Sequence, residues 1–104
     1  MIAMNQELFN EYTNANKPVL VEFWAPWCVY CRRIAPALDK LAEQQQDMVI
    51  AQVNIDDEPL LANREQIEVI PTLILYRDGQ ALGSIVAPES KAKIEEFIRQ
   101  TLEK

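Results

Sequence analysis

The sequence predicts an α/β fold with a central mixed β-sheet of four to five strands, flanked by helices on both faces. Segments with strand character alternate with segments of helical spacing, so the predicted order is (β)αβαβαββα. Helices between strands imply crossover connections and a sheet covered on both sides. A predicted hairpin near the C-terminus adds antiparallel pairing.

The N-terminal quarter is predicted to contain a short edge strand, a helix and a central strand. Residues 1–4, "MIAM", are compatible with a short edge strand. Asn5 is the predicted N-cap of a short helix, whose apolar face comprises Leu8, Phe9 and Tyr12. Residues 18–25, "PVLVEFWA", form a nearly unbroken apolar run, which is typical of a central strand covered on both faces.

Two helices and a strand are expected in the middle of the chain. Apolar residues recur at helical spacing from Cys28 to about Gln45, and Pro36 should kink that helix because proline removes one backbone hydrogen bond. Residues 48–56, "MVIAQVNID", read as a strand. A short helix follows, with Pro59 at the first helical position, where proline is tolerated.

The C-terminal third is predicted to contain a hairpin and a last helix. Residues 71–87 read as two strands joined at Asp78-Gly79, a strong hairpin signal. The helix begins at about Glu89, and its buried stripe comprises Ile94, Phe97, Ile98 and Leu102. No repeat or linker interrupts the chain, so residues 1–104 are predicted to form a single domain.

Composition and charge exclude some classes of binding partner and bear on the cellular location. The chain has 104 residues, a net charge of −6 and ten scattered basic residues, which argues against nucleic acid and anionic membrane surfaces as partners. No apolar run approaches the roughly 18 residues of a membrane span. The first twelve residues lack the features of a signal peptide. We therefore expect a cytoplasmic monomer.

The absence of histidine excludes several classes of site. It rules out Ser–His and Cys–His nucleophile arrangements and mixed Cys/His zinc fingers. The only cysteines are Cys28 and Cys31 in "WCVYC", and two thiolates alone do not complete a four-ligand metal site. We expect no metal and no cofactor other than this cysteine pair.

The two cysteines allow three interpretations. As a structural staple, a closed loop of about four residues gives only ~2 kcal/mol of stabilisation. A metal cluster shared between two chains is a second interpretation. The third is a reversible redox couple: Cys28 lies at a helix N-terminus, where free N–H groups and the helix dipole should lower its pKa, and Cys31 lies one turn further on. The redox couple is the preferred interpretation.

The chain resembles the thioredoxin family. The matching segments are "VLVEFWAPWCVYCRRIAP", "VNID" and "IPTLILYRDGQ", in the order and at the spacing of the family, and they span nearly the whole chain. The resemblance implies a thioredoxin fold and the reduction of protein disulfides by dithiol–disulfide exchange. Cys28 would be the attacking thiolate and Cys31 the resolving thiol, with Trp27 beside them and Trp24 packed beneath.

The resemblance also identifies a substrate-binding surface. Pro71 would be a cis-proline facing the disulfide, and the backbone of Ile70 would pair with an extended substrate segment. Ala87 occupies a position where a glycine commonly borders this surface. Pro36 would support the active-site helix.

Glu22 fits its apolar surroundings poorly. Burial should raise the pKa of this carboxyl, and the family usually has an aspartate here that assists proton transfer at the resolving thiol. We expect Glu22 to be the general acid/base for Cys31. The alternative is a carboxylate at a strand edge that reaches solvent. Gln52 stands where the family often has a lysine near this carboxylate.

The leading functional prediction is a protein-disulfide reductase. Its electrons would come from a separate reductase, because the chain has no G-x-G-x-x-G fingerprint of a dinucleotide site. Val29-Tyr30 replaces the Gly-Pro typical of thioredoxin, which favours a shift toward the oxidising side. One alternative is therefore a more oxidising thiol oxidase or disulfide isomerase. Another is a non-catalytic binding module that uses the same surface.

Overall fold

The computed structural model describes all 104 residues and contains five strands and four helices. The strands are β1 (Ile2–Ala3), β2 (Val19–Trp24), β3 (Val49–Asn54), β4 (Thr72–Arg77) and β5 (Gln80–Val86). The helices are α1 (Gln6–Thr13), α2 (Val29–Gln44), α3 (Pro59–Arg64) and α4 (Lys91–Leu102). The predicted element order and the mixed sheet are confirmed, including the weak edge strand at the N-terminus.

The five strands form one mixed sheet in the order β1-β3-β2-β4-β5. The first three in that order are mutually parallel, whereas β4 is antiparallel to both β2 and β5. β2 is therefore central, and its residues are almost all buried. This burial explains its continuous apolar sequence, since each face of the strand contacts a hydrophobic core.

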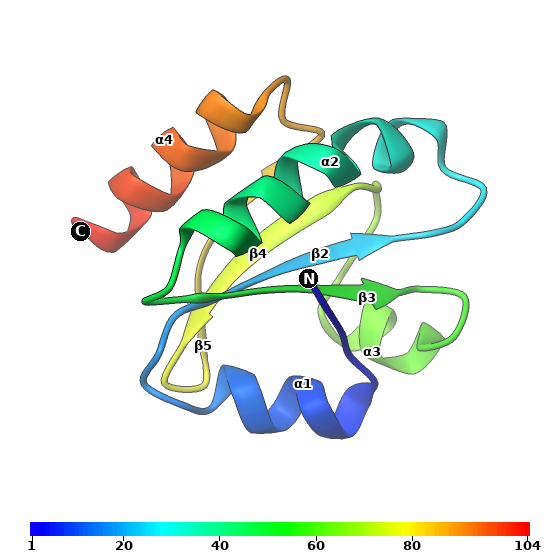
Figure 1. The fold of residues 1–104 in the computed structure, drawn as a ribbon. Helices are drawn as coiled ribbons and strands as arrows, with labels where there is room; N and C mark the ends of the chain where they lie inside the picture. The colour runs from blue at the N-terminus through cyan, green and yellow to red at the C-terminus, as the bar shows by residue number, and fades with distance from the viewer.

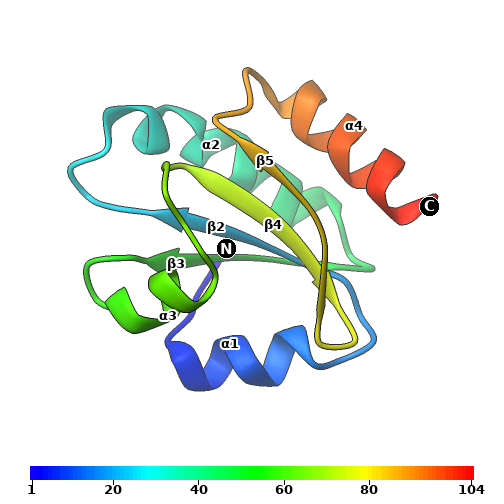
Figure 2. The same cartoon turned by 180° about the vertical axis from the view of Figure 1, so that it is seen from behind.

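Helices cover the sheet on both faces, and a separate core lies under each pair (Figure 1). On one face α1 and α3 pack through Phe9 and Leu61. On the other, α2 and α4 pack through Leu38 and Ile94, which are fully buried. The view from behind shows the same three-layer arrangement, with β5 at one edge of the sheet (Figure 2).

Antiparallel pairing brings distant segments to one end of the sheet. Phe23, near the end of β2, is in register with Thr72, the first residue of β4. Thr72 is also in register with Val86, the last residue of β5. The segments that follow β2, precede β4 and follow β5 consequently meet at the same end of the sheet.

The predicted hairpin turn is confirmed at Asp78 and Gly79. Both residues have positive φ, 54° and 78°, as a two-residue turn between twisted strands requires. A Cβ atom on Gly79 would lie only 2.7 Å from the Oδ1 atom of Asn14. Backbone conformation and close approach both favour glycine at this position.

The start of α1 is capped from two directions. The Asn5 side chain accepts a hydrogen bond from the Leu8 amide at 2.9 Å, as its predicted N-cap role requires. The carboxylate of Glu58 accepts a second bond from the Gln6 amide at 3.0 Å. Glu58 is itself the N-cap residue of α3, but its side chain makes no bond to that helix. It instead ties the start of α3 to α1.

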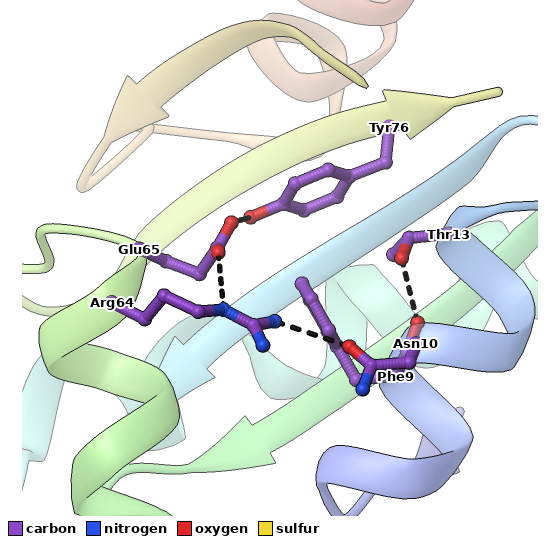
Figure 3. Close-up of polar contacts among 6 residues, drawn as sticks. All are labelled: Phe9, Asn10, Thr13, Arg64, Glu65 and Tyr76. Carbon is purple, nitrogen blue, oxygen red and sulfur yellow. Dashed lines mark hydrogen bonds and ion pairs between the residues drawn. The ribbon is translucent and has the colours of Figure 1, made fainter. Parts of the chain in front are cut away.

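A polar network joins α1, α3 and β4 (Figure 3). The Tyr76 hydroxyl donates to Oε1 of Glu65 at 2.7 Å, and Nε of Arg64 donates to Oε2 at 3.1 Å. Arg64 also donates to Oδ1 of Asn10 at 3.1 Å and lies 5.6 Å from the centre of the Phe9 ring. Burial, followed by the hydrogen bond and charge of Glu65, raises the pKa of Tyr76, so its hydroxyl remains a donor.

Replacing Tyr76 with Phe should lower the free energy of unfolding by about 1–2 kcal/mol, because it removes a half-buried hydrogen bond to a carboxylate. Urea-induced unfolding measures this change. Tyr12→Phe is the matched control, since the Tyr12 hydroxyl makes no hydrogen bond within the chain, and it should cost less than about 0.5 kcal/mol. Equal effects of the two variants would show that the network contributes nothing to stability.

Candidate active site

Cys28 and Cys31 form a disulfide at the N-terminus of α2, with their Cα atoms 5.3 Å apart. Cys28 is the N-cap residue of this helix, and its Sγ atom accepts a hydrogen bond from the Cys31 amide at 3.2 Å. An N–H donor and a helix N-terminus both stabilise negative charge on that sulfur. Cys31 is 2% exposed and Cys28 is 8% exposed, so Cys28 is the more accessible of the two.

Apolar side chains surround the disulfide. Ala25 is fully buried against the two cysteines, and Trp24, Ile55 and Ile70 pack around this small cluster. These residues come from the ends of β2 and β3 and from the segment before β4. The predicted position of Trp24 beneath the pair is consistent with this packing, and its indole Nε1 is buried without a hydrogen-bond partner.

The segment before β4 carries a cis peptide bond between Ile70 and Pro71, as the family motif implied. Ile70 packs against the cysteine cluster, and Pro71 is buried. The Pro71 carbonyl accepts a hydrogen bond from the Ala87 amide at 2.9 Å. Residues predicted for the substrate-binding surface from two distant segments are therefore adjacent in the structure.

Ala87 adopts an unusual backbone conformation. Its φ is 44°, in the left-handed region, which costs an L-residue roughly 1–2 kcal/mol. The preference for glycine at the corresponding family position thus has a physical basis. Ala87 is exposed, at the point where the chain leaves β5.

Trp27 lies at the surface beside the disulfide, with 64% of its area exposed. Its Nε1 atom donates to Oδ2 of Asp56 at 3.0 Å, which fixes the orientation of the indole. Sequence reasoning did not single out Asp56. The signal was available, because β2 and β3 are parallel with Trp24 opposite Asn54, so residues just after both strands lie close together.

Pro36 lies inside α2 at an exposed position. The helix continues across it without interruption, although proline cannot supply an amide hydrogen bond there. The predicted kink and supporting role of Pro36 remain predictions.

Glu22 is buried in the middle of the sheet, with 2% of its area exposed. The alternative of a carboxylate at a strand edge is wrong, because β2 has neighbours on both sides and Glu22 is in register with Gln52 and Leu73. Its Oε2 atom has no hydrogen-bond partner. Burial, with a smaller contribution from the charge of Asp39, raises the pKa of Glu22 from 4.5 to about 7.

The surroundings of Glu22 connect it to the active-site helix. Leu73, its register partner on β4, belongs to the core that packs under α2. Asp39, whose charge acts on Glu22, is itself a residue of α2. Gln52 on β3 carries no charge that would stabilise an ionised carboxylate. Glu22 therefore lies under the helix whose first turn carries Cys31, in an environment that favours its neutral form.

No three His, Cys, Asp or Glu side chains cluster as ligands for a metal ion. None of the four helices combines the length and the apolar character needed to cross a membrane.

Comparisons with known proteins agree with this geometry. A family model described as "Thioredoxin" matches residues 1–100. A thioredoxin from Mycobacterium tuberculosis (strain ATCC 25618 / H37Rv) is 44% identical over 82 residues, which cover 78% of this chain and 71% of the relative. A bifunctional thioredoxin reductase/thioredoxin from Mycobacterium leprae (strain TN) is 40% identical over 87 residues, covering 83% of this chain and 19% of the relative. The structure of Plasmodium falciparum thioredoxin matches with a TM-score of 0.88 and 25% identity, covering 96% of this chain and 98% of that one.

The raised pKa of Glu22 should make stability depend on pH. Between about pH 4.5 and 7 the folded protein keeps a proton that the unfolded chain loses, so the free energy of unfolding falls as pH rises through this window. Glu22→Gln cannot titrate. Its stability relative to the wild type should therefore increase by about 2–3 kcal/mol between pH 4 and pH 8.

Urea unfolding of the oxidised protein at several pH values measures this difference. Glu43→Gln, at an exposed position of α2, is the matched control and should show a change below about 0.5 kcal/mol. A stability difference between Glu22→Gln and wild type that stays constant with pH would contradict a raised pKa at Glu22.

Proposed function

The chain belongs to the thioredoxin family, and from that premise we propose that it is a protein-disulfide reductase with the active site Cys28-Val29-Tyr30-Cys31. Family membership together with the Cys28–Cys31 pair makes it a dithiol–disulfide oxidoreductase. The direction of the reaction, the order of attack and the assisting residues belong to the proposal. The observation that carries it is the cysteine pair at the N-terminus of α2.

The proposed reaction begins with both cysteines reduced. The Cys28 thiolate attacks a substrate disulfide, so a Cys28–substrate bond forms while the substrate S–S bond breaks, and the first substrate sulfur leaves as a thiolate that takes a proton from water. Cys31 then attacks the Cys28 sulfur, which forms the Cys28–Cys31 disulfide and releases the second substrate thiol. The substrate gains two electrons and two protons. The lower burial of Cys28 and the N–H donor on its sulfur support this order of attack.

We assign Glu22 the proton transfer at Cys31. The Cys31 thiol must lose a proton as it attacks, and this proposal is supported by the burial of Glu22 on the face of the sheet that α2 covers. A pKa of about 7 keeps both protonation states of Glu22 populated near neutral pH, which suits an acid/base group that works in both directions of exchange. The absence of a hydrogen bond to Oε2 leaves that oxygen free to take the proton.

An extended segment of a protein substrate would bind across Trp27, Ile70, Pro71 and Ala87. Trp27 offers an exposed apolar surface beside Cys28. Ile70 makes no backbone hydrogen bond within the chain, so its backbone is free to pair with an incoming strand. Substrate pairing at this point would place a disulfide against the cysteines, because the Ile70 side chain packs on them.

The electrons would come from a separate reductase. One relative is named a bifunctional thioredoxin reductase/thioredoxin, whereas this chain has no dinucleotide fingerprint. We propose that the chain acts as a single-domain monomer in the cytoplasm, where disulfides are kept reduced. No cofactor beyond the cysteine pair is required.

Reduction of insulin disulfides, driven by dithiothreitol, tests the proposal. The wild type should accelerate insulin precipitation, whereas Cys28→Ser and Cys31→Ser should each lose at least about 100-fold in rate, because each stops the exchange cycle. Cys31→Ser should accumulate a mixed disulfide through Cys28, and Cys28→Ser should not. If a variant with both substitutions, Cys28→Ser and Cys31→Ser, kept the biological activity of the wild type, the protein would instead be a binding module that needs no disulfide exchange.

Glu22→Gln should slow resolution of the mixed disulfide by at least about tenfold near pH 7, because the proton acceptor is lost. Formation of the mixed disulfide should change little. Rapid-quench trapping with a peptide disulfide separates the two steps, and Glu43→Gln controls for loss of a surface carboxylate. An unchanged resolution rate would exclude an acid/base role for Glu22.

A further inference from the structure

The two residues between the cysteines lie in different environments. Val29 is 60% exposed at the surface. Tyr30 is half-buried and packs against the core that lies between the sheet and helices α2 and α4. The Tyr30 hydroxyl donates a hydrogen bond to the Pro88 carbonyl at 2.8 Å, across 58 residues of sequence. Tyr30 thus contacts the segment that follows β5.

The segment that Tyr30 reaches is one wall of the proposed substrate-binding surface. Pro88 is buried and follows Ala87, whose amide donates to the Pro71 carbonyl at 2.9 Å. Two hydrogen bonds therefore connect the first turn of α2, the 87–88 segment and the cis-proline. Ala87 is held in the left-handed region, so this backbone conformation depends on external contacts.

We propose that Tyr30 is a specificity-determining positioning residue, whose hydroxyl holds the Ala87–Pro88 segment at a fixed distance from Cys28. This inference rests on the proposed function, because it concerns how a polypeptide disulfide is accepted at that site. An extended polypeptide needs both walls of the binding surface in place. A small disulfide needs only access to Cys28. Tyr30 thereby favours protein disulfides over small ones.

The phenol acts through the backbone and not on the sulfur atoms. Its hydroxyl bonds to a carbonyl group, whereas the Cys28 sulfur takes its hydrogen bond from the Cys31 amide. Tyr30→Phe keeps the ring that packs in the core and removes only the hydroxyl. The reduction potential of the pair should therefore be unchanged within the error of measurement.

Kinetics of Tyr30→Phe with two substrates test the proposal. In the assay driven by dithiothreitol, KM for insulin should rise about three- to tenfold, the range expected for loss of one neutral hydrogen bond, while kcat stays within about twofold. The second-order rate at which the pre-reduced protein, freed of dithiothreitol, reduces 5,5′-dithiobis(2-nitrobenzoate), a small disulfide, should be unchanged within about twofold. Tyr12→Phe, on α1, is the matched control and should behave as the wild type with both substrates. Equal losses on both substrates, or no loss on insulin, would overturn the proposal.

A second measurement separates this proposal from the proposed function. Amide hydrogen exchange of Ala87 in the oxidised protein, followed by NMR, should be several times faster in Tyr30→Phe than in the wild type, because the segment carrying the Ala87–Pro71 hydrogen bond is less restrained. If the wild type fails to reduce insulin, the reductase function fails while this readout still tests the contact. Unchanged exchange at Ala87 would overturn the role of Tyr30 whatever the direction of catalysis.

Discussion

The active site depends on the antiparallel pairing of β2 with β4. The register between Phe23 and Thr72 places the last residues of β2 and the first residues of β4 at the same end of the sheet. This single constraint brings the cysteine-bearing turn to the Ile70–Pro71 peptide. The pairing of β4 with β5 then brings Ala87 to the same end of the sheet. The cysteine pair and its proposed substrate-binding surface are thus assembled from three segments that are far apart in the sequence.

The same central strand also introduces an energetic conflict. β2 ends next to the active-site turn, and it places Glu22 among apolar side chains with an oxygen that lacks any partner. A hydrophobic residue there would favour folding at neutral pH, since an ionised buried carboxylate costs several kcal/mol. Buried polar groups that violate packing rules cluster at functional sites in proteins. For this reason we propose that Glu22 carries out the proton transfer at Cys31.

Local signals made most of the fold predictable. Continuous apolar runs, the Asn5 cap, Pro59 and the Asp78-Gly79 turn each act within a few residues, so each was identified from sequence. The cysteine pair was located by the same local reasoning, as two residues at the start of a helix after a strand. The cis peptide at Pro71 came only from resemblance to a family, because residue type alone does not reveal an isomer.

Hydrogen bonds between residues far apart in the sequence were not predictable. The bonds of Tyr30 to Pro88 and of Tyr76 to Glu65 depend on how three layers pack, which no spacing in the sequence encodes. Glu58 stands at the N-cap position of α3, but its side chain bonds to the Gln6 amide of α1, a contact that no local pattern indicates. The left-handed conformation of Ala87 was hidden because alanine ordinarily avoids it.

The reduction potential of the Cys28–Cys31 pair tests most directly whether this fold works as a reductase. Equilibration against dithiothreitol or glutathione buffers, followed by quantification of the two thiols, gives the value. A reductase requires a potential at or below about −200 mV, in the range of thioredoxins and glutaredoxins. A value near −120 mV would contradict it and indicate an oxidant, because such a pair takes electrons from protein thiols.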